Sequence, residues 1–178
     1  TSNIKFKNFN ISILKKPKKF KNENWFKNIK LLDSLKSNYR YSYSKQQIKK
    51  IKKNKNFRLI GMGGSILGAE AIYNFLSHKI KKNFIFFNNL NPKIINYNKK
   101  IKAANIIISK SGNTLETIVN SNILISKSEN IFITEKKNNY LRILAKNLKS
   151  EIIEHKNYIG GRYSVLSEVG MLPAEIMG

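Results

Sequence analysis

The amino-acid sequence predicts an α/β domain built on a doubly wound parallel sheet of five strands. Short, nearly continuous apolar runs such as Phe84–Phe87 and Asn105–Ile108 alternate with stretches of helical spacing. Parallel strands have this character because helices cover both faces of the sheet. The chain has 178 residues, of which 41% are hydrophobic, and this suits one domain with an appendage.

The first 44 residues are predicted to form a basic, helical N-terminal segment. Apolar residues between Trp25 and Leu35 recur with loosely helical spacing, which favours an amphipathic helix over 23–37. Ser44 is a favourable N-cap, so a second helix is expected to follow it and to end before Asn56. We therefore divide the chain into a segment 1–44 and an α/β domain 45–178.

Strands and helices then alternate along the α/β domain. The apolar runs and the spacing between them predict strands at 57–60, 84–87, 105–108, 130–133 and 151–154, and helices at 67–78, 114–126, 140–148 and 168–177. A flavodoxin-like strand order, 2-1-3-4-5, would make the first and third strands neighbours.

The formal net charge of +24 favours a nucleic-acid partner, but the kind of basic residue argues against one. The chain has 30 Lys and 4 Arg, and Lys, Asn and Ile together make 82 of its 178 residues. All three use codons rich in A and T, which indicates a nucleotide bias of the genome. Arginine is the side chain that binds phosphates and bases with two parallel hydrogen bonds. We expect no nucleic-acid partner, and a nucleic-acid-binding protein is the alternative that charge alone favours.

Other classes of protein are not favoured by the composition. No apolar run approaches the roughly 20 residues of a membrane-spanning helix, so no membrane partner is expected. The chain has no Cys, and a reducing cytoplasm is the expected location. No cluster of His, Cys and carboxylates suggests a metal site, and no cofactor is expected.

A glycine-rich loop follows the first expected strand and leads into a helix. It reads Gly61-Met-Gly-Gly-Ser65 and continues to Gly68. Backbone amides at such a position point outward, at the positive end of the helix dipole. A dinucleotide fingerprint is excluded because Ile66 stands where a glycine is needed, and a P-loop is excluded by Ala69-Glu70. The loop is therefore either a ligand-binding loop or a tight turn.

A loop rich in hydroxyl groups follows the third expected strand. It reads Ser109-Lys-Ser-Gly-Asn-Thr114 and also precedes a helix. Hydroxyls and backbone amides at a helix N-terminus suit a phosphate monoester. Capping of the helix by Thr114 is the alternative. If the first and third strands are neighbours, both loops flank one crevice at the switch point of the sheet.

The two loops resemble those of the sugar isomerase (SIS) domain, a phosphosugar-binding α/β fold. A third segment, Tyr158-Ile-Gly-Gly-Arg-Tyr-Ser164 and its continuation to Pro173, is similar to the Gly-Gly-Arg signature of the glucose-6-phosphate isomerase family. The three motifs occur in the family's order and cover about residues 57–178. The first 45 residues or so show no matching motif.

The resemblance implies an aldose–ketose isomerase of glycolysis and gluconeogenesis that acts on glucose 6-phosphate and fructose 6-phosphate through a cis-enediolate. It implies that Gly64 and Ser65 contact the sugar hydroxyls and that Arg162 stabilises the oxyanion near C1 and C2. An ion pair of Arg162 with Glu154 or Glu168 is the alternative. The implied phosphate cradle consists of Ser109, Lys110, Ser111 and Thr114.

Groups that the family needs for proton transfer are expected outside this chain. The family's catalytic glutamate, ring-opening histidine and late lysine follow the Gly-Gly-Arg segment, and neither His78 nor His155 matches its histidine motif. We therefore expect a fragment that supplies the phosphate and sugar site, has negligible turnover alone and forms a homodimer when full length. A non-catalytic SIS module that binds phosphosugar and regulates a partner is the alternative.

Overall fold

A parallel sheet of five strands organises the chain in the computed structural model, which describes residues 29–92, 94, 102–125 and 129–178. The strand order is β2-β1-β3-β4-β5, as expected for a doubly wound fold, so the fold-class prediction is confirmed. The strands are β1 (Asn56–Gly61), β2 (Asn83–Phe87), β3 (Ala104–Ile108), β4 (Asn130–Thr134) and β5 (Glu151–Glu154).

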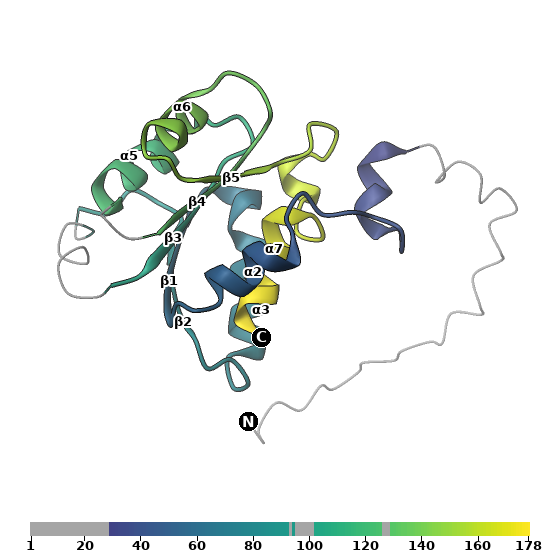
Figure 1. Cartoon of the computed structure of the whole chain (residues 1–178), viewed down its shortest axis with the longest axis horizontal. Helices are drawn as coiled ribbons and strands as arrows, with labels where there is room; N and C mark the ends of the chain where they lie inside the picture. The colour runs from purple at the N-terminus through teal and green to yellow at the C-terminus, as the bar shows by residue number, and fades with distance from the viewer. Residues whose placement is uncertain (1–28, 93, 95–101, 126–128) are drawn as a thin grey trace, which may run out of the picture.

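Helices cover both faces of this sheet (Figure 1). One face packs against α2 (Lys45–Ile51), α3 (Leu67–Leu76) and α7 (Glu168–Met177). The other face packs against α5 (Leu115–Leu124) and α6 (Tyr140–Asn147). Of the helices within the described ranges, none is both long and apolar enough to cross a membrane.

Alternation along the strands divides the core into two layers. Leu59 and Ile106 belong to the layer under α3 and α7, whereas Ile60 and Ile107 belong to the layer under α5 and α6. All four side chains are fully buried. Because both faces are covered, the strands are apolar over most of their length, which explains the apolar runs, although Arg58 in β1 and Asn105 in β3 are buried as well.

The N-terminal segment differs in part from its predicted helix. Its described part contains a 3-10 helix, Lys30–Leu35, instead of an α-helix, and the start of the predicted 23–37 helix lies outside the described residues. None of the residues of this short helix is fully buried, so packing stabilises it only weakly. The predicted helix after Ser44 is confirmed, and Ser44 forms a capping box with Gln47.

Residues just before α2 are bound to the first turn of α7. Glu168 is fully buried, and its carboxylate accepts hydrogen bonds from the Tyr39 hydroxyl (3.0 Å) and from the Ser42 main chain (2.9 Å) and hydroxyl (3.1 Å). Lys156 Nζ lies 4.0 Å from the same carboxylate and over the Tyr39 ring. These contacts attach residues 39–42 to the α/β unit, and the domain boundary at residue 44 stays a prediction.

We expect Tyr39→Phe to lower the free energy of unfolding by about 1.5–3 kcal/mol, because it removes a hydrogen bond to a buried carboxylate. Tyr41→Phe is the matched control, since the Tyr41 hydroxyl has no hydrogen bond to any described residue and the ring contacts with Tyr39 and Tyr43 are kept. Urea unfolding of both variants measures the difference. Equal losses in the two variants would contradict this account of Glu168.

Candidate functional site

The glycine-rich loop and the hydroxyl-rich loop lie side by side at the carboxyl edge of the sheet. β1 and β3 are neighbours, and their last residues, Gly61 and Ile108, are in register. A Cβ added at Gly61 would lie 3.1 Å from the Ile108 main-chain oxygen and 3.3 Å from Cβ of Ser65. Ser65 therefore lies directly above the junction of the two strands, and it is only 8% exposed.

The Gly-Gly-Arg segment packs against the glycine-rich loop through main-chain contacts. A Cβ at Gly64 would collide with the carbonyl oxygen of Gly161, so only glycine allows this approach. The Ser164 hydroxyl is within 2.6 Å of the Gly161 oxygen and 3.3 Å of the Gly64 oxygen, as a donor to both. Arg162 is thereby carried on a 3-10 turn, Gly161–Tyr163, that rests on the first loop.

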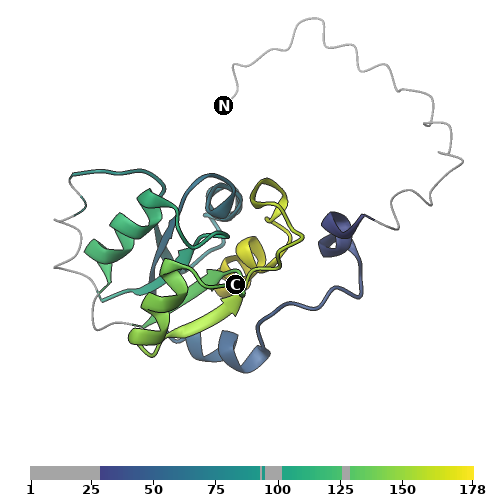
Figure 2. The ribbon, with the colours of Figure 1, turned by 90° about the horizontal axis from the view of Figure 1, so that it is seen from above.

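Two further glycines hold the same segment from the helices that flank it. A Cβ at Gly68 in α3 would collide with the side chain of Val165, and one at Gly170 in α7 would collide with the Val165 carbonyl oxygen. Figure 2 shows the yellow segment that precedes α7 lying beside α3. The segment is therefore placed by close packing against α3 and α7 as well as by the first loop.

The hydroxyl-rich loop is closed by its own side chains. Ser109 is 2% exposed, and its Oγ accepts from the Gly112 amide (3.1 Å) and lies 2.9 Å from the Thr114 hydroxyl. Thr114 is the N-cap residue of α5, but its side chain makes no capping bond to the helix. Capping by the Thr114 hydroxyl, the alternative interpretation, is therefore wrong. The first turn of α5 lacks a side-chain cap, and the positive end of its dipole faces the loop.

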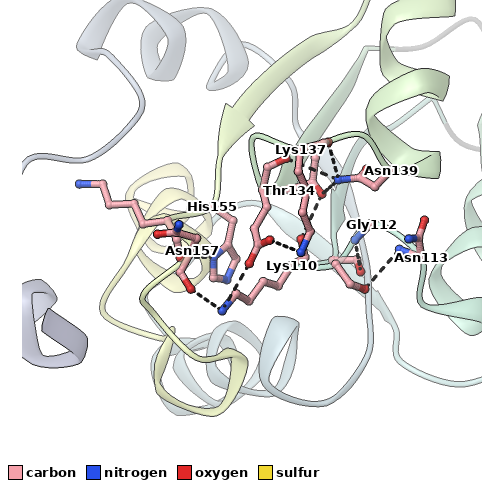
Figure 3. A network of polar contacts seen from close by, with 12 residues as sticks. Lys110, Gly112, Asn113, Thr134, Lys137, Asn139, His155 and Asn157 are labelled. Atoms are coloured by element: carbon pink, nitrogen blue, oxygen red, sulfur yellow. Dashed lines mark hydrogen bonds and ion pairs between the residues drawn. The ribbon is translucent and has the colours of Figure 1, made fainter.

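Asn139, between β4 and α6, supports the hydroxyl-rich loop. The sequence analysis did not identify it as a site residue. Gly112 has φ +68°, and a Cβ there would collide with the Asn139 side chain. Asn139 Nδ2 donates to Thr134 Oγ1 (3.1 Å; Figure 3), and the Leu141 amide donates to the Gly112 oxygen (3.1 Å). Asn139 could have been found in the sequence as the N-cap residue of α6, where its Oδ1 accepts a hydrogen bond from the Arg142 amide.

Lys110 links the hydroxyl-rich loop to two other strand ends. Its ammonium donates to the main-chain oxygen of Asn157 at 2.7 Å and lies 3.4 Å from Glu135 Oε1, while Glu135 Oε2 is 2.6 Å from Lys137 (Figure 3). Burial raises the pKa of Glu135, but hydrogen bonds and charges from Lys137 and Lys110 outweigh it, so the pKa is lowered overall. Glu135 is therefore an ionised, buried counterion of both lysines.

Arg162 and Ser111 are the exposed members of the candidate set. None of the ion pairs among the described residues involves Arg162, and Glu168 is bound instead by Tyr39 and Ser42. The alternative that Arg162 pairs with Glu168 or Glu154 is thus not seen. An exposed guanidinium at the rim of the two loops can bind an anion without first breaking an ion pair.

His155 follows β5 directly and is 1% exposed, and its ring lies beside Lys110 (Figure 3). Its Nδ1 donates to the Lys156 main-chain oxygen (3.1 Å), which leaves Nε2 as an acceptor without a described partner. Burial lowers the pKa of His155, and the charge of Lys110 lowers it further, against weaker opposing effects of the Lys156 oxygen, Glu168 and Glu135. The ring is therefore neutral in the folded chain near neutral pH.

Two hollows lie elsewhere on the described surface. One of about 430 Å³ is at the end of β2, between Ile85 and Ile94, and one of about 260 Å³ is near Tyr39 and Lys156. Neither is lined by the predicted site residues, which instead form an open edge. Within the described part of the chain, no three His, Cys, Asp or Glu side chains gather as a metal site.

Comparison with known proteins places this arrangement in a family. A family model described as phosphoglucose isomerase matches residues 27–178. Glucose-6-phosphate isomerases of Borreliella afzelii and Methanocaldococcus jannaschii are 36% and 35% identical over 68% and 78% of this chain. The chain spans 26% and 37% of the length of these two curated relatives.

Solved structures share the fold. A hypothetical protein of Thermus thermophilus has a TM-score of 0.66 and 25% identity over 75% of this chain and 36% of its own. A tagatose-6-phosphate ketose/aldose isomerase of Escherichia coli has a TM-score of 0.53 and 16% identity over 80% of this chain and 41% of its own.

Gly64→Ala tests the packing of the Gly-Gly-Arg segment. We expect a loss of about 1–3 kcal/mol in the free energy of unfolding, because the new methyl group collides with the Gly161 oxygen. Gly161→Ala is the matched control, since a Cβ there meets nothing within 4 Å. Thermal or urea unfolding measures both variants, and a Gly161→Ala loss as large as that of Gly64→Ala would refute the packing argument.

His155 predicts a dependence of stability on acid pH. The unfolded chain takes up a proton near pH 6.5, while the buried ring stays neutral, so the free energy of unfolding falls as pH drops below about 6.5, by at most about 1.4 kcal/mol per pH unit. His155→Phe is expected to flatten this part of the profile. Identical slopes in the wild-type chain and in His155→Phe would disprove the assignment.

Proposed function

Because this chain belongs to the phosphoglucose isomerase family, we propose that it provides the phosphate and sugar site of an enzyme that interconverts glucose 6-phosphate and fructose 6-phosphate. One observation carries the proposal. The loops after β1 and β3 and the segment that bears Arg162 converge at one edge of the sheet. The phosphate, the sugar and the reacting carbons of one small ligand can therefore be contacted together.

The hydroxyl-rich loop is proposed to hold the phosphate. Ser111 is exposed at the turn, and Ser109 and Thr114 pair their hydroxyls at the start of α5. A phosphate dianion there can accept hydrogen bonds from the hydroxyls and from the uncapped amides of the helix. Each hydrogen bond to a charged acceptor contributes about 1.5–3 kcal/mol. Lys110 adds positive charge beside the loop. A few such bonds suffice for micromolar affinity after the cost of association.

The sugar is proposed to lie between the two loops, with Arg162 at its reacting end. Gly64 and Ser65 line the first loop, and Gly161 brings the main chain of the third segment against Gly64. Isomerisation removes the proton next to the carbonyl and leaves negative charge on oxygen. A guanidinium placed beforehand stabilises that charge in the transition state, because it needs no reorganisation during the reaction.

The proton-transfer groups are proposed to lie outside these 178 residues. Buried His155 has one nitrogen engaged with the Lys156 oxygen, and Glu135 and Glu168 are engaged with lysines or with Tyr39 and Ser42. A general base contributes about 10²–10⁴-fold to such a rate. The 178-residue chain is therefore proposed to bind phosphosugar with negligible turnover. A cytoplasmic location and a homodimer of the intact protein belong to the same proposal.

Replacing Ser111 by Ala and Thr114 by Val tests the phosphate assignment. The double variant should bind glucose 6-phosphate at least about tenfold more weakly, because donors to the dianion are lost, and should bind glucose within about twofold of wild type. Calorimetric titration of the 178-residue chain measures both affinities. Ser77→Ala, at the far end of α3, is the control. An equal loss for both ligands would place the phosphate elsewhere.

A further inference from the structure

We propose that Lys110 is a positioning residue whose ammonium ties the phosphate loop to the segment that carries Arg162, and that this ammonium is not itself a phosphate ligand. The inference rests on the proposed function and refines the role of one residue within it. In this proposal Lys110 fixes the distance between the bound phosphate and the Arg162 guanidinium. That distance in turn makes the site prefer a phosphorylated sugar over phosphate alone.

The geometry of Lys110 is that of a bridge. Its ammonium donates to the main-chain oxygen of Asn157 at 2.7 Å and lies 3.4 Å from Glu135 Oε1. Glu135 follows β4, and Asn157 follows β5 and precedes Gly160 by three residues. One side chain thus connects the ends of β3, β4 and β5. In Figure 3 the ammonium lies on the Asn157 side of the loop, away from Gly112 and Asn113.

Leaving this position would be costly for the lysine. The Glu135 side chain is 9% exposed, and without Lys110 its remaining ion pair is with Lys137, whose side chain is 61% exposed. The Asn157 oxygen would lose a charge-assisted hydrogen bond at the same time. Removing one partner of a buried ion pair costs more folding free energy than the pair itself contributes, because the other charge is left buried without a counterion. The ammonium is therefore better stabilised by its present partners than by an exposed phosphate.

The phosphate loop does not need this ammonium as a direct ligand. Its proposed donors are the hydroxyls and the uncapped first turn of α5. Gly112 and Asn113, which belong to this turn of the loop, lie away from Asn157 and from the Lys110 ammonium (Figure 3). The Gly-Gly-Arg segment, by contrast, is attached to the first loop by Ser164 and to the hydroxyl-rich loop by Lys110. Loss of the lysine therefore frees the segment relative to the phosphate but leaves the cradle intact.

Lys137 offers a control matched in charge. Lys110→Met and Lys137→Met each remove one positive charge next to Glu135, but only Lys110 touches Asn157. Both variants should bind inorganic phosphate with affinities within about threefold of each other, because long-range charge effects cancel in the comparison. Lys110→Met should bind glucose 6-phosphate at least tenfold more weakly than Lys137→Met, and Lys110→Arg, which can reach both acceptors, should restore most of that affinity.

Two results of these titrations would overturn the proposal. A loss of tenfold or more in inorganic-phosphate binding by Lys110→Met relative to Lys137→Met would make the ammonium a direct phosphate ligand. Equal binding of glucose 6-phosphate by the two variants would mean that Lys110 positions nothing. If Lys110→Met fails to fold, Glu135→Gln replaces it, since it removes the ion pair and should weaken glucose 6-phosphate binding at least threefold more than phosphate binding.

Hydrogen exchange separates this inference from the proposed function. If the wild-type chain binds glucose 6-phosphate no better than glucose, the proposed function fails, but Lys110 can still be tested without ligand. Amides of residues 157–164 should exchange at least tenfold faster in Lys110→Met than in Lys137→Met, while those of β1 and β3 stay protected. Unchanged exchange in 157–164 would refute the positioning role.

Discussion

The contact between Gly64 and Gly161 is the constraint on which the rest of the site depends. Two main-chain segments, separated by almost a hundred positions in sequence, approach so closely that no side chain fits between them. Gly68 and Gly170 hold the adjoining Val165 in the same way. Such packing restricts where the segment with Arg162 can lie, because protein interiors are densely packed. A flexible loop could carry the same residues without placing them.

Buried charges complete the placement that packing begins. Glu168 binds the residues before α2, and Glu135 holds Lys110 and Lys137 at the end of β4. Each carboxylate is satisfied by several donors, as a buried charge must be. Both carboxylates act electrostatically on the buried, neutral ring of His155, as Lys110 does. The ends of β3, β4 and β5 therefore form one electrostatic unit under the candidate phosphate site.

The fold was largely predictable from the sequence, whereas details of the site were not. Continuous apolar runs predict buried parallel strands because helices cover both faces, and all five strands lie within one residue of their expected bounds. Ser44 was recognisable as a cap, since its capping box is local. The segment over 23–37 was less predictable, since its described part is a 3-10 helix with no buried residue. A short α-helix needs an apolar face packed against the rest of the protein, and the spacing of apolar residues does not show whether that packing exists.

The sequence by itself determined the succession of strands and helices along the chain. It also determined which two loops precede helices and which residues those loops contain. These properties follow from local spacing and backbone preference, which a chain carries wherever it folds. Only the tertiary structure decided that Thr114 bonds to Ser109 instead of its helix, that Asn139 supports Gly112, and that Lys110 reaches Asn157 and Glu135. Those partners come from different strand ends, and their meeting depends on the order of the sheet, which no local pattern encodes.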